Sequence, residues 1–60
     1  MSEREILEIE VAAHRARVEE ITAALADAPE DKMAPLLKME LRGRSAAVEV
    51  GSARLRMLRD

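Results

Sequence analysis

His14 is the only histidine in the 60-residue chain, and Glu10 lies one helical turn before it. A Glu/His pair at this spacing can share a metal ion, but di-metal sites in helical bundles use a Glu-x-x-His spacing with further glutamates on facing helices. Residue 11 is Val, so that spacing fails here. We therefore predict no metal site, and we expect His14 to set helix register or to pair with its symmetry mate.

Nucleophilic chemistry finds no support in the sequence. The chain has no Cys, which removes disulfides and thiolate metal sites. Ser45 and Ser52 have no second base to complete a Ser/His/Asp arrangement, and no general acid/base pair stands out. We therefore expect a protein that is not an enzyme and that needs no cofactor.

Three carboxylates cluster near the middle of the chain, at Asp27, Glu30 and Asp31. In charge, this tip resembles the acidic hairpin tips of transcript-cleavage factors, whose carboxylates hold Mg²⁺ inside an RNA polymerase channel. The chain lacks the second globular domain of that family. Helix capping and the dipole of a following helix account for Glu30 and Asp31, so we expect no Mg²⁺ site.

Basic residues gather in the second half of the chain. Residues 1–33 hold nine acids and four bases, a sum of −5, whereas residues 34–60 hold six bases and three acids, a sum of +3. Complementary exteriors of two packed helices explain this asymmetry. The alternative is a helix face that grips phosphates. Its candidate nucleic-acid contacts are Lys38, Arg42, Arg56 and Arg59.

These side chains must be positioned by helices. Residues 3–27 predict the first helix, and Ser2 with Glu5 fits a capping box at its start. Its apolar residues alternate in steps of four and three, a pattern typical of a coiled-coil seam. This seam comprises Leu7, Val11, His14, Val18, Ile21, Leu25 and Ala28. A weaker stripe drifts around the helix through Ile6, Ile9, Ala13, Ala16 and Ala23.

A turn over residues 28–33 should separate the first helix from a second helix over about 34–59. Pro29 ends the first helix by Ala28, because proline disfavours helical geometry in the residue before it. Pro35 suits the first turn of the second helix, where its missing N–H costs nothing. A break at Gly43 with Ser45 capping a third helix is the alternative that we weigh, although the apolar spacing keeps its phase there.

The second helix carries two apolar seams that point more than about 90° apart at 3.6 residues per turn. The bulky seam is Leu37, Leu41, Arg44, Val48, Gly51, Leu55 and Leu58. The small-residue seam is Leu36, Met39, Gly43, Ala46, Val50, Ala53 and Met57. Two contact faces on one helix imply two neighbours: the first helix and a second copy of the chain. Adding Ala47, we predict the small-residue seam as the oligomer interface, with its closest helix crossing at Gly43, Ala46, Ala47 and Val50.

The predicted fold class is therefore all-α: a single-domain antiparallel two-helix hairpin that completes a four-helix bundle as a homodimer. A chain this short makes a marginal core by itself, and without disulfides or metals oligomerisation is the remedy left. The residues expected to be buried are Leu7, Val11, Val18, Ile21, Leu25, Leu37, Leu41, Val48, Leu55 and Leu58.

In length and hairpin design the chain resembles the Rop family, whose hairpins dimerise into four-helix bundles that bind paired RNA loops. It has no aromatic residue to stack on a base, however, and its first helix is acidic, whereas that helix faces RNA in the family. It also resembles the ring-forming oligomerisation hairpins of phage small-terminase subunits.

Two hypotheses on function follow. The first is a non-enzymatic oligomerisation or protein-interaction module, an assembly or regulatory adaptor of the kind that phages and plasmids carry. The second is a small nucleic-acid-binding regulator. No apolar stretch approaches the ~20 residues of a membrane span, and no basic leader is visible. We therefore expect no membrane partner and a cytoplasmic location.

Overall fold

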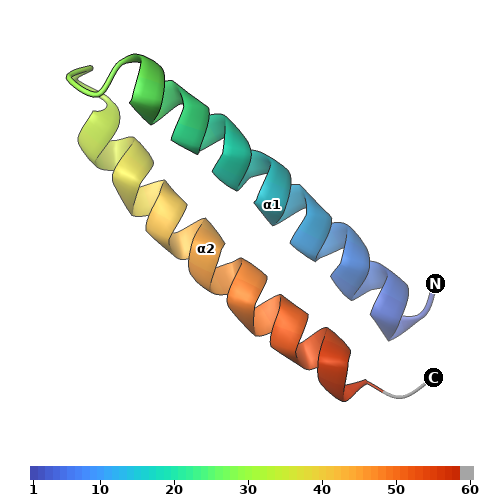
Figure 1. Cartoon of the computed structure of the whole chain (residues 1–60). Helices are drawn as coiled ribbons and strands as arrows, with labels where there is room; N and C mark the ends of the chain where they lie inside the picture. Colours follow the sequence, from blue (N-terminus) through green and yellow to red (C-terminus); the bar gives the residue numbers. More distant parts are fainter. Residues whose placement is uncertain (59–60) are drawn as a thin grey trace.

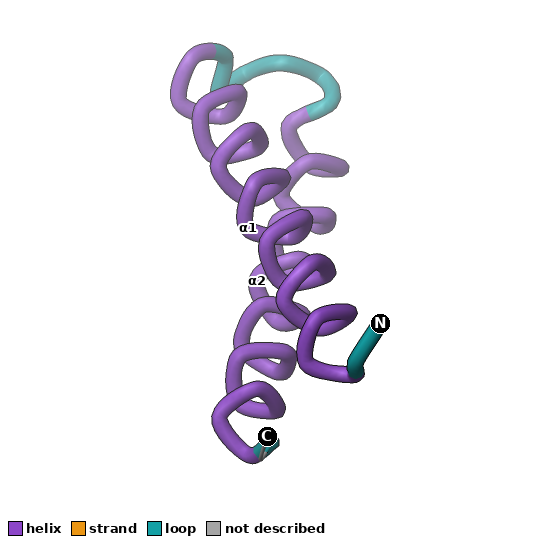
Figure 2. The backbone as a smooth tube through the Cα atoms, turned by 90° about the vertical axis from the view of Figure 1, so that its right-hand side faces the viewer, coloured by secondary structure: helices purple, strands orange, loops and turns teal. Residues whose placement is uncertain are grey.

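The computed structural model describes residues 1–58. They form two helices, α1 (Glu3–Asp27) and α2 (Ala34–Met57), and the described residues contain no strand. The helices lie antiparallel as a hairpin about a turn over residues 28–33 (Figure 1). Seen from the side, they cross instead of running strictly parallel (Figure 2). The hairpin is elongated, with extents of 46 × 15 × 13 Å. The predicted all-α hairpin is thus confirmed.

The start of α1 is capped by Ser2, as its sequence predicts. Ser2 adopts an extended backbone, and its hydroxyl oxygen accepts a hydrogen bond of 3.2 Å from the backbone N–H of Glu5. Glu3 and Glu5 place negative charge in the first turn, where the helix dipole is positive. Local chemistry therefore fixes this helix end.

The turn is closed by polar groups of its own. Asp31 accepts a hydrogen bond of 2.8 Å at Oδ1 from the backbone N–H of Met33, the residue that precedes α2. Pro35 lies in the first turn of α2, the position predicted for it. Ala34, beside it, is only 4% exposed, a burial that the sequence pattern did not indicate.

The helix α2 runs without interruption through Gly43, so the alternative of a break there is wrong. It ends at Met57, slightly earlier than predicted, because Leu58 turns to an extended backbone. The N–H of Leu58 still donates 3.1 Å to the carbonyl oxygen of Arg54 and closes the last turn. Arg59 lies outside the described residues.

The core lies where the seam of α1 meets the bulky seam of α2. Val11 and Ile21 are buried, with 7% and 1% exposure. The other residues predicted to be buried are only half-buried, namely Leu7, Val18, Leu25, Leu37, Leu41, Val48, Leu55 and Leu58. Two helices cover each other from one side alone, so most seam residues keep an edge in water. One hairpin therefore buries little of its own apolar surface.

Candidate functional site

Most of the small-residue seam of α2 faces away from α1, and no other element of the described chain covers it. Its larger side chains are mostly exposed: Leu36 by 56%, Met39 by 70%, Val50 by 69% and Met57 by 82%. Between them, Gly43 and Ala46 are exposed and Ala53 is half-buried. The eighth predicted interface residue, Ala47, is half-buried beside this seam. The structure thus places the bulky seam of α2 against α1 and leaves the small-residue seam mostly exposed.

Ala47 and Val50 also line a groove between the two helices. On the α1 side, this groove is walled by Leu7, Glu10 and Val11. The helices approach closely here because Gly51 of α2 carries no side chain. One edge of the small-residue seam, at Val50, therefore reaches the groove between the two helices.

The two glycines of α2 have different surroundings. A methyl group added at Gly51 would lie 2.5 Å from Cγ2 of Val11, so packing within the hairpin requires glycine there. A methyl group added at Gly43 would meet nothing within 4 Å. Glycine in a helix interior costs up to ~1 kcal/mol relative to alanine. Packing within the described chain does not account for that cost at Gly43.

The outward side of α1 carries apolar side chains too. Ile6 is 44% exposed and Ile9 is 57% exposed. The alanines of the same weak stripe, at positions 13, 16 and 23, are also exposed. This stripe is interrupted by exposed acids such as Glu20, whereas the small-residue seam of α2 contains no charged residue.

The total accessible surface of the chain is 4790 Å². A compact monomer of this mass would expose about 3,900 Å², so the hairpin shows roughly 900 Å² more than its size requires. This excess fits the elongated shape and the uncovered seam.

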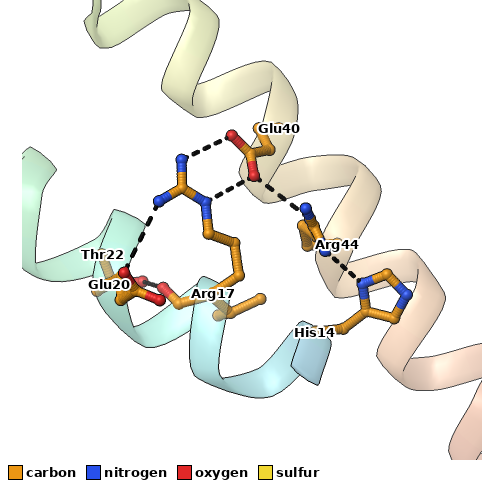
Figure 3. Close-up of polar contacts among 7 residues, drawn as sticks. His14, Arg17, Glu20, Thr22, Glu40 and Arg44 are labelled. Carbon is orange, nitrogen blue, oxygen red and sulfur yellow. Dashed lines mark hydrogen bonds and ion pairs between the residues drawn. The ribbon is translucent and has the colours of Figure 1, made fainter. Parts of the chain in front are cut away.

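A polar network joins the helices near their middle (Figure 3). Arg17 of α1 donates from Nε and Nη2 to the carboxylate of Glu40 in α2, at 2.7 and 3.0 Å. Arg44 lies 3.3 Å from the same carboxylate and 3.0 Å from Nδ1 of His14. Because a guanidinium can only donate, Nδ1 of His14 must be the acceptor and carry no proton. His14 therefore pairs within its own hairpin.

The network shifts the ionisation of its central carboxyl. The hydrogen bond from Arg17 lowers the pKa of Glu40 below its ordinary value, with smaller help from the charges of Arg17 and Arg44, although desolvation opposes the shift. The same hydrogen bond raises the pKa of Arg17. Both groups are partly exposed, at 37% for Arg17 and 32% for Glu40. The arrangement links the two helices across the hairpin.

The sequence pattern did not identify the cross-helix ion pairs, although it held a signal for them. Arg17 immediately precedes Val18 of one seam, and Glu40 immediately precedes Leu41 of the other. Residues flanking facing seams commonly pair across helices. A second pair shares this relation on the α2 side, because Arg54 precedes Leu55 and donates 2.8 Å to Glu3 near the open end of the hairpin.

The candidate nucleic-acid contacts Lys38, Arg42 and Arg56 are all exposed on α2. None of the three forms an ion pair within residues 1–58. Glu49 is exposed between Arg42 and Arg56, as the sequence indicates. The row is therefore accessible and mixed in charge.

Two places in the sequence, the acidic turn and His14, were candidates for metal binding. In the structure, side chains at both places make hydrogen bonds within the hairpin. Asp31 accepts from the backbone N–H of Met33 within the turn, and it does not cap α2, whose N-cap residue Met33 has no side-chain cap bond. His14 accepts from Arg44. Over the described range, no group of three or more acids and histidines is arranged to hold a metal ion.

Neither α1 nor α2, over the part described, has the length and apolar character that crossing a bilayer requires. In comparisons with protein-family models, curated proteins and solved structures, the chain matches none.

Proposed function

We propose that this protein is a non-enzymatic helical oligomerisation and interaction module whose working unit is a homodimeric four-helix bundle. The observation that carries the proposal is the small-residue seam of α2, which is apolar along six helical turns and uncovered by α1. Single exposed apolar residues are common on monomers, but a continuous row of them is typical of a contact surface.

The surface areas support an interface of ordinary size. The excess of roughly 900 Å² over a compact monomer is close to the ~800 Å² that each partner buries in a standard protein interface. A second hairpin is the simplest occupant, because closed twofold dimers are the commonest oligomers. The exposed charged sides of the bundle would then be free to bind another protein, as an assembly or regulatory adaptor does.

Sedimentation equilibrium tests the proposal directly. We expect a mass of twice 6.7 kDa at micromolar concentration. A folded monomer across the whole concentration range contradicts the proposal. A defined mass well above two chains instead supports the ring-forming arrangement that small-terminase hairpins use.

A pair of variants locates the contact. Val50→Asp places a charge in the small-residue seam, where burial without a partner is costly, so we expect the dimer to dissociate. Ser45→Asp makes a similar charge change at an exposed position outside that seam and serves as the control. Equal masses for the two variants would show that Val50 lies outside the interface.

The second candidate function is a nucleic-acid-binding regulator, supported by Lys38, Arg42 and Arg56, which are exposed and form no ion pair among residues 1–58. Its test is a titration of duplex DNA and RNA binding against salt. Phosphate contacts release counterions, so genuine binding should weaken steeply as salt rises. Absence of binding at low salt removes this candidate.

A further inference from the structure

We infer that two copies pack α2 against α2 in antiparallel orientation, with the twofold axis close to Ala46. This inference rests on the proposed self-association and specifies its geometry. In this geometry the small-residue seam of one copy packs against the same seam of the other. Three observations support the geometry: the position of Gly43, the order of residue sizes along the seam, and two charged residues beside it.

Gly43 marks where the partner helix comes closest. The hairpin itself needs no glycine there, because a methyl group at Gly43 would meet nothing within 4 Å. Gly51, by contrast, is required by packing, because Val11 of the neighbouring helix lies directly against it. Gly43, Ala46 and Ala47 together form a low stretch at the middle of α2, which lets a second helix approach.

Antiparallel packing about Ala46 also matches large residues with small ones. Counting seam positions outward from Ala46, Val50 lies opposite the partner's Gly43, and Met39 lies opposite the partner's Ala53. Only the outermost positions, Leu36 and Met57, pair two large side chains. A parallel pair would instead set Met39 against Met39 of the partner subunit and Gly43 against the partner's Gly43. That arrangement crowds one layer and leaves a gap in another, which close-packed interfaces avoid.

The charges beside the seam favour the same orientation. Arg42 and Glu49 lie on one flank of the small-residue seam, one on each side of Ala46, and neither has an ion pair within the described residues. When two helices pack antiparallel, the same flank of each helix meets its copy in reverse. Arg42 then faces Glu49 of the partner subunit, and the symmetry repeats this pair.

The acidic turn at one end of the hairpin also favours the antiparallel orientation. A parallel dimer would bring the acidic turns of both chains, each with Asp27, Glu30 and Asp31, to one end of the bundle. The antiparallel dimer separates the turns by the length of the molecule, which is 46 Å. It also places the dipoles of the two α2 helices in opposition, which is the favourable sense.

Disulfide capture distinguishes the orientations, since the natural chain has no Cys. The experiment mixes Met39→Cys chains with Ala53→Cys chains under a glutathione redox buffer and follows crosslinked dimer by mass spectrometry. Met39 is exposed and Ala53 is half-buried in the single hairpin. We expect rapid crosslinking in the mixture and little in the Met39→Cys chain alone. Self-crosslinking of Met39→Cys would overturn the antiparallel orientation.

The outcomes separate the geometry from the function. A dimer by sedimentation whose mixture does not crosslink would overturn the seam as the interface but leave self-association intact. A monomer by sedimentation would refute the proposed function itself, and the inferred geometry with it.

A charge exchange provides a second, independent test. Arg42→Glu and Glu49→Arg should each raise the dimer dissociation constant about tenfold at low salt, because each creates two like-charge contacts. The double variant should recover near wild-type affinity. Failure of the double variant to recover would overturn the pairing of these two residues.

Discussion

Val11 of α1 lies directly over Gly51 of α2, so close that a methyl group on Gly51 would come within 2.5 Å of Cγ2 of Val11. Val11 is 7% exposed, and Gly51 is buried beneath it. The valine thus fills the space that a side chain at position 51 would take. This contact sets how closely the two helices approach, and it distinguishes Gly51 from Gly43, which has open space around it.

The two glycines should respond oppositely to alanine. Gly43→Ala should stabilise the isolated hairpin by up to ~1 kcal/mol through helix propensity. Gly51→Ala should destabilise it, because the β-branched Val11 has little rotamer freedom with which to yield. Urea unfolding at low protein concentration measures both changes. Adding Val11→Ala should relieve the loss at Gly51→Ala, and no relief would contradict the packing described.

A charge in the bulky seam should be more damaging than one on the open side. Val48 is half-buried where α2 meets α1. Val48→Asp should therefore unfold the hairpin, with a loss of roughly 2 kcal/mol or more, measured by circular dichroism against temperature. An unchanged melting curve would show that the packing of Val48 against α1 does not contribute to stability.

Acid should weaken the contact between Arg17 and Glu40. The pKa of Glu40 is lower in the folded chain than its ordinary value of 4.5, so the unfolded chain binds this proton more readily. The stabilisation is therefore present above about pH 4.5 and is lost as pH falls through the lower, folded value. Unfolding by urea at pH 7 and pH 3 measures the difference.

Glu40→Gln should reduce this pH dependence, because it removes the titrating group. Glu19→Gln is the matched control, since Glu19 is exposed and has no ion pair within residues 1–58. Identical pH profiles for the two variants would show that the pairing with Arg17 adds nothing.

His14 can be tested as a packing position. It occupies the α1 seam between Val11 and Val18, and its imidazole accepts from Arg44. His14→Leu should raise the free energy of unfolding by about 1 kcal/mol through added apolar burial, while Arg44 keeps Glu40 as a partner. His14→Ala should lower it. A less stable leucine variant would show that the hydrogen bond outweighs packing.

Self-association predicts that stability depends on concentration. A tenfold increase in protein should raise the thermal midpoint by roughly 5 °C, because dimer formation removes folded monomer from the unfolding equilibrium. Differential scanning calorimetry from low to high micromolar concentration makes the measurement. A constant midpoint would indicate that the hairpin is stable by itself.

The sequence by itself determined the two helices, the bounds of the first helix and the start of the second. Ser2 with Glu5 specified the start of α1, and Pro29 and Pro35 placed the turn, because capping and proline geometry act between near neighbours. The alternating steps of four and three also predicted the side of each helix on which the buried Val11, Ile21 and Gly51 lie. These properties depend on periodicity and local hydrogen bonds, which a sequence shows directly.

The tertiary structure decided which seam of α2 packs against α1 and how closely the two helices approach. Only the packed hairpin shows that Gly51 is required by Val11 while Gly43 is not, although both are single glycines on the same helix. Likewise, the pairing of His14 with Arg44 depends on the relative placement of two helices. Such contacts join residues 30 or more positions apart, and their geometry follows from how the helices cross, which local patterns do not specify.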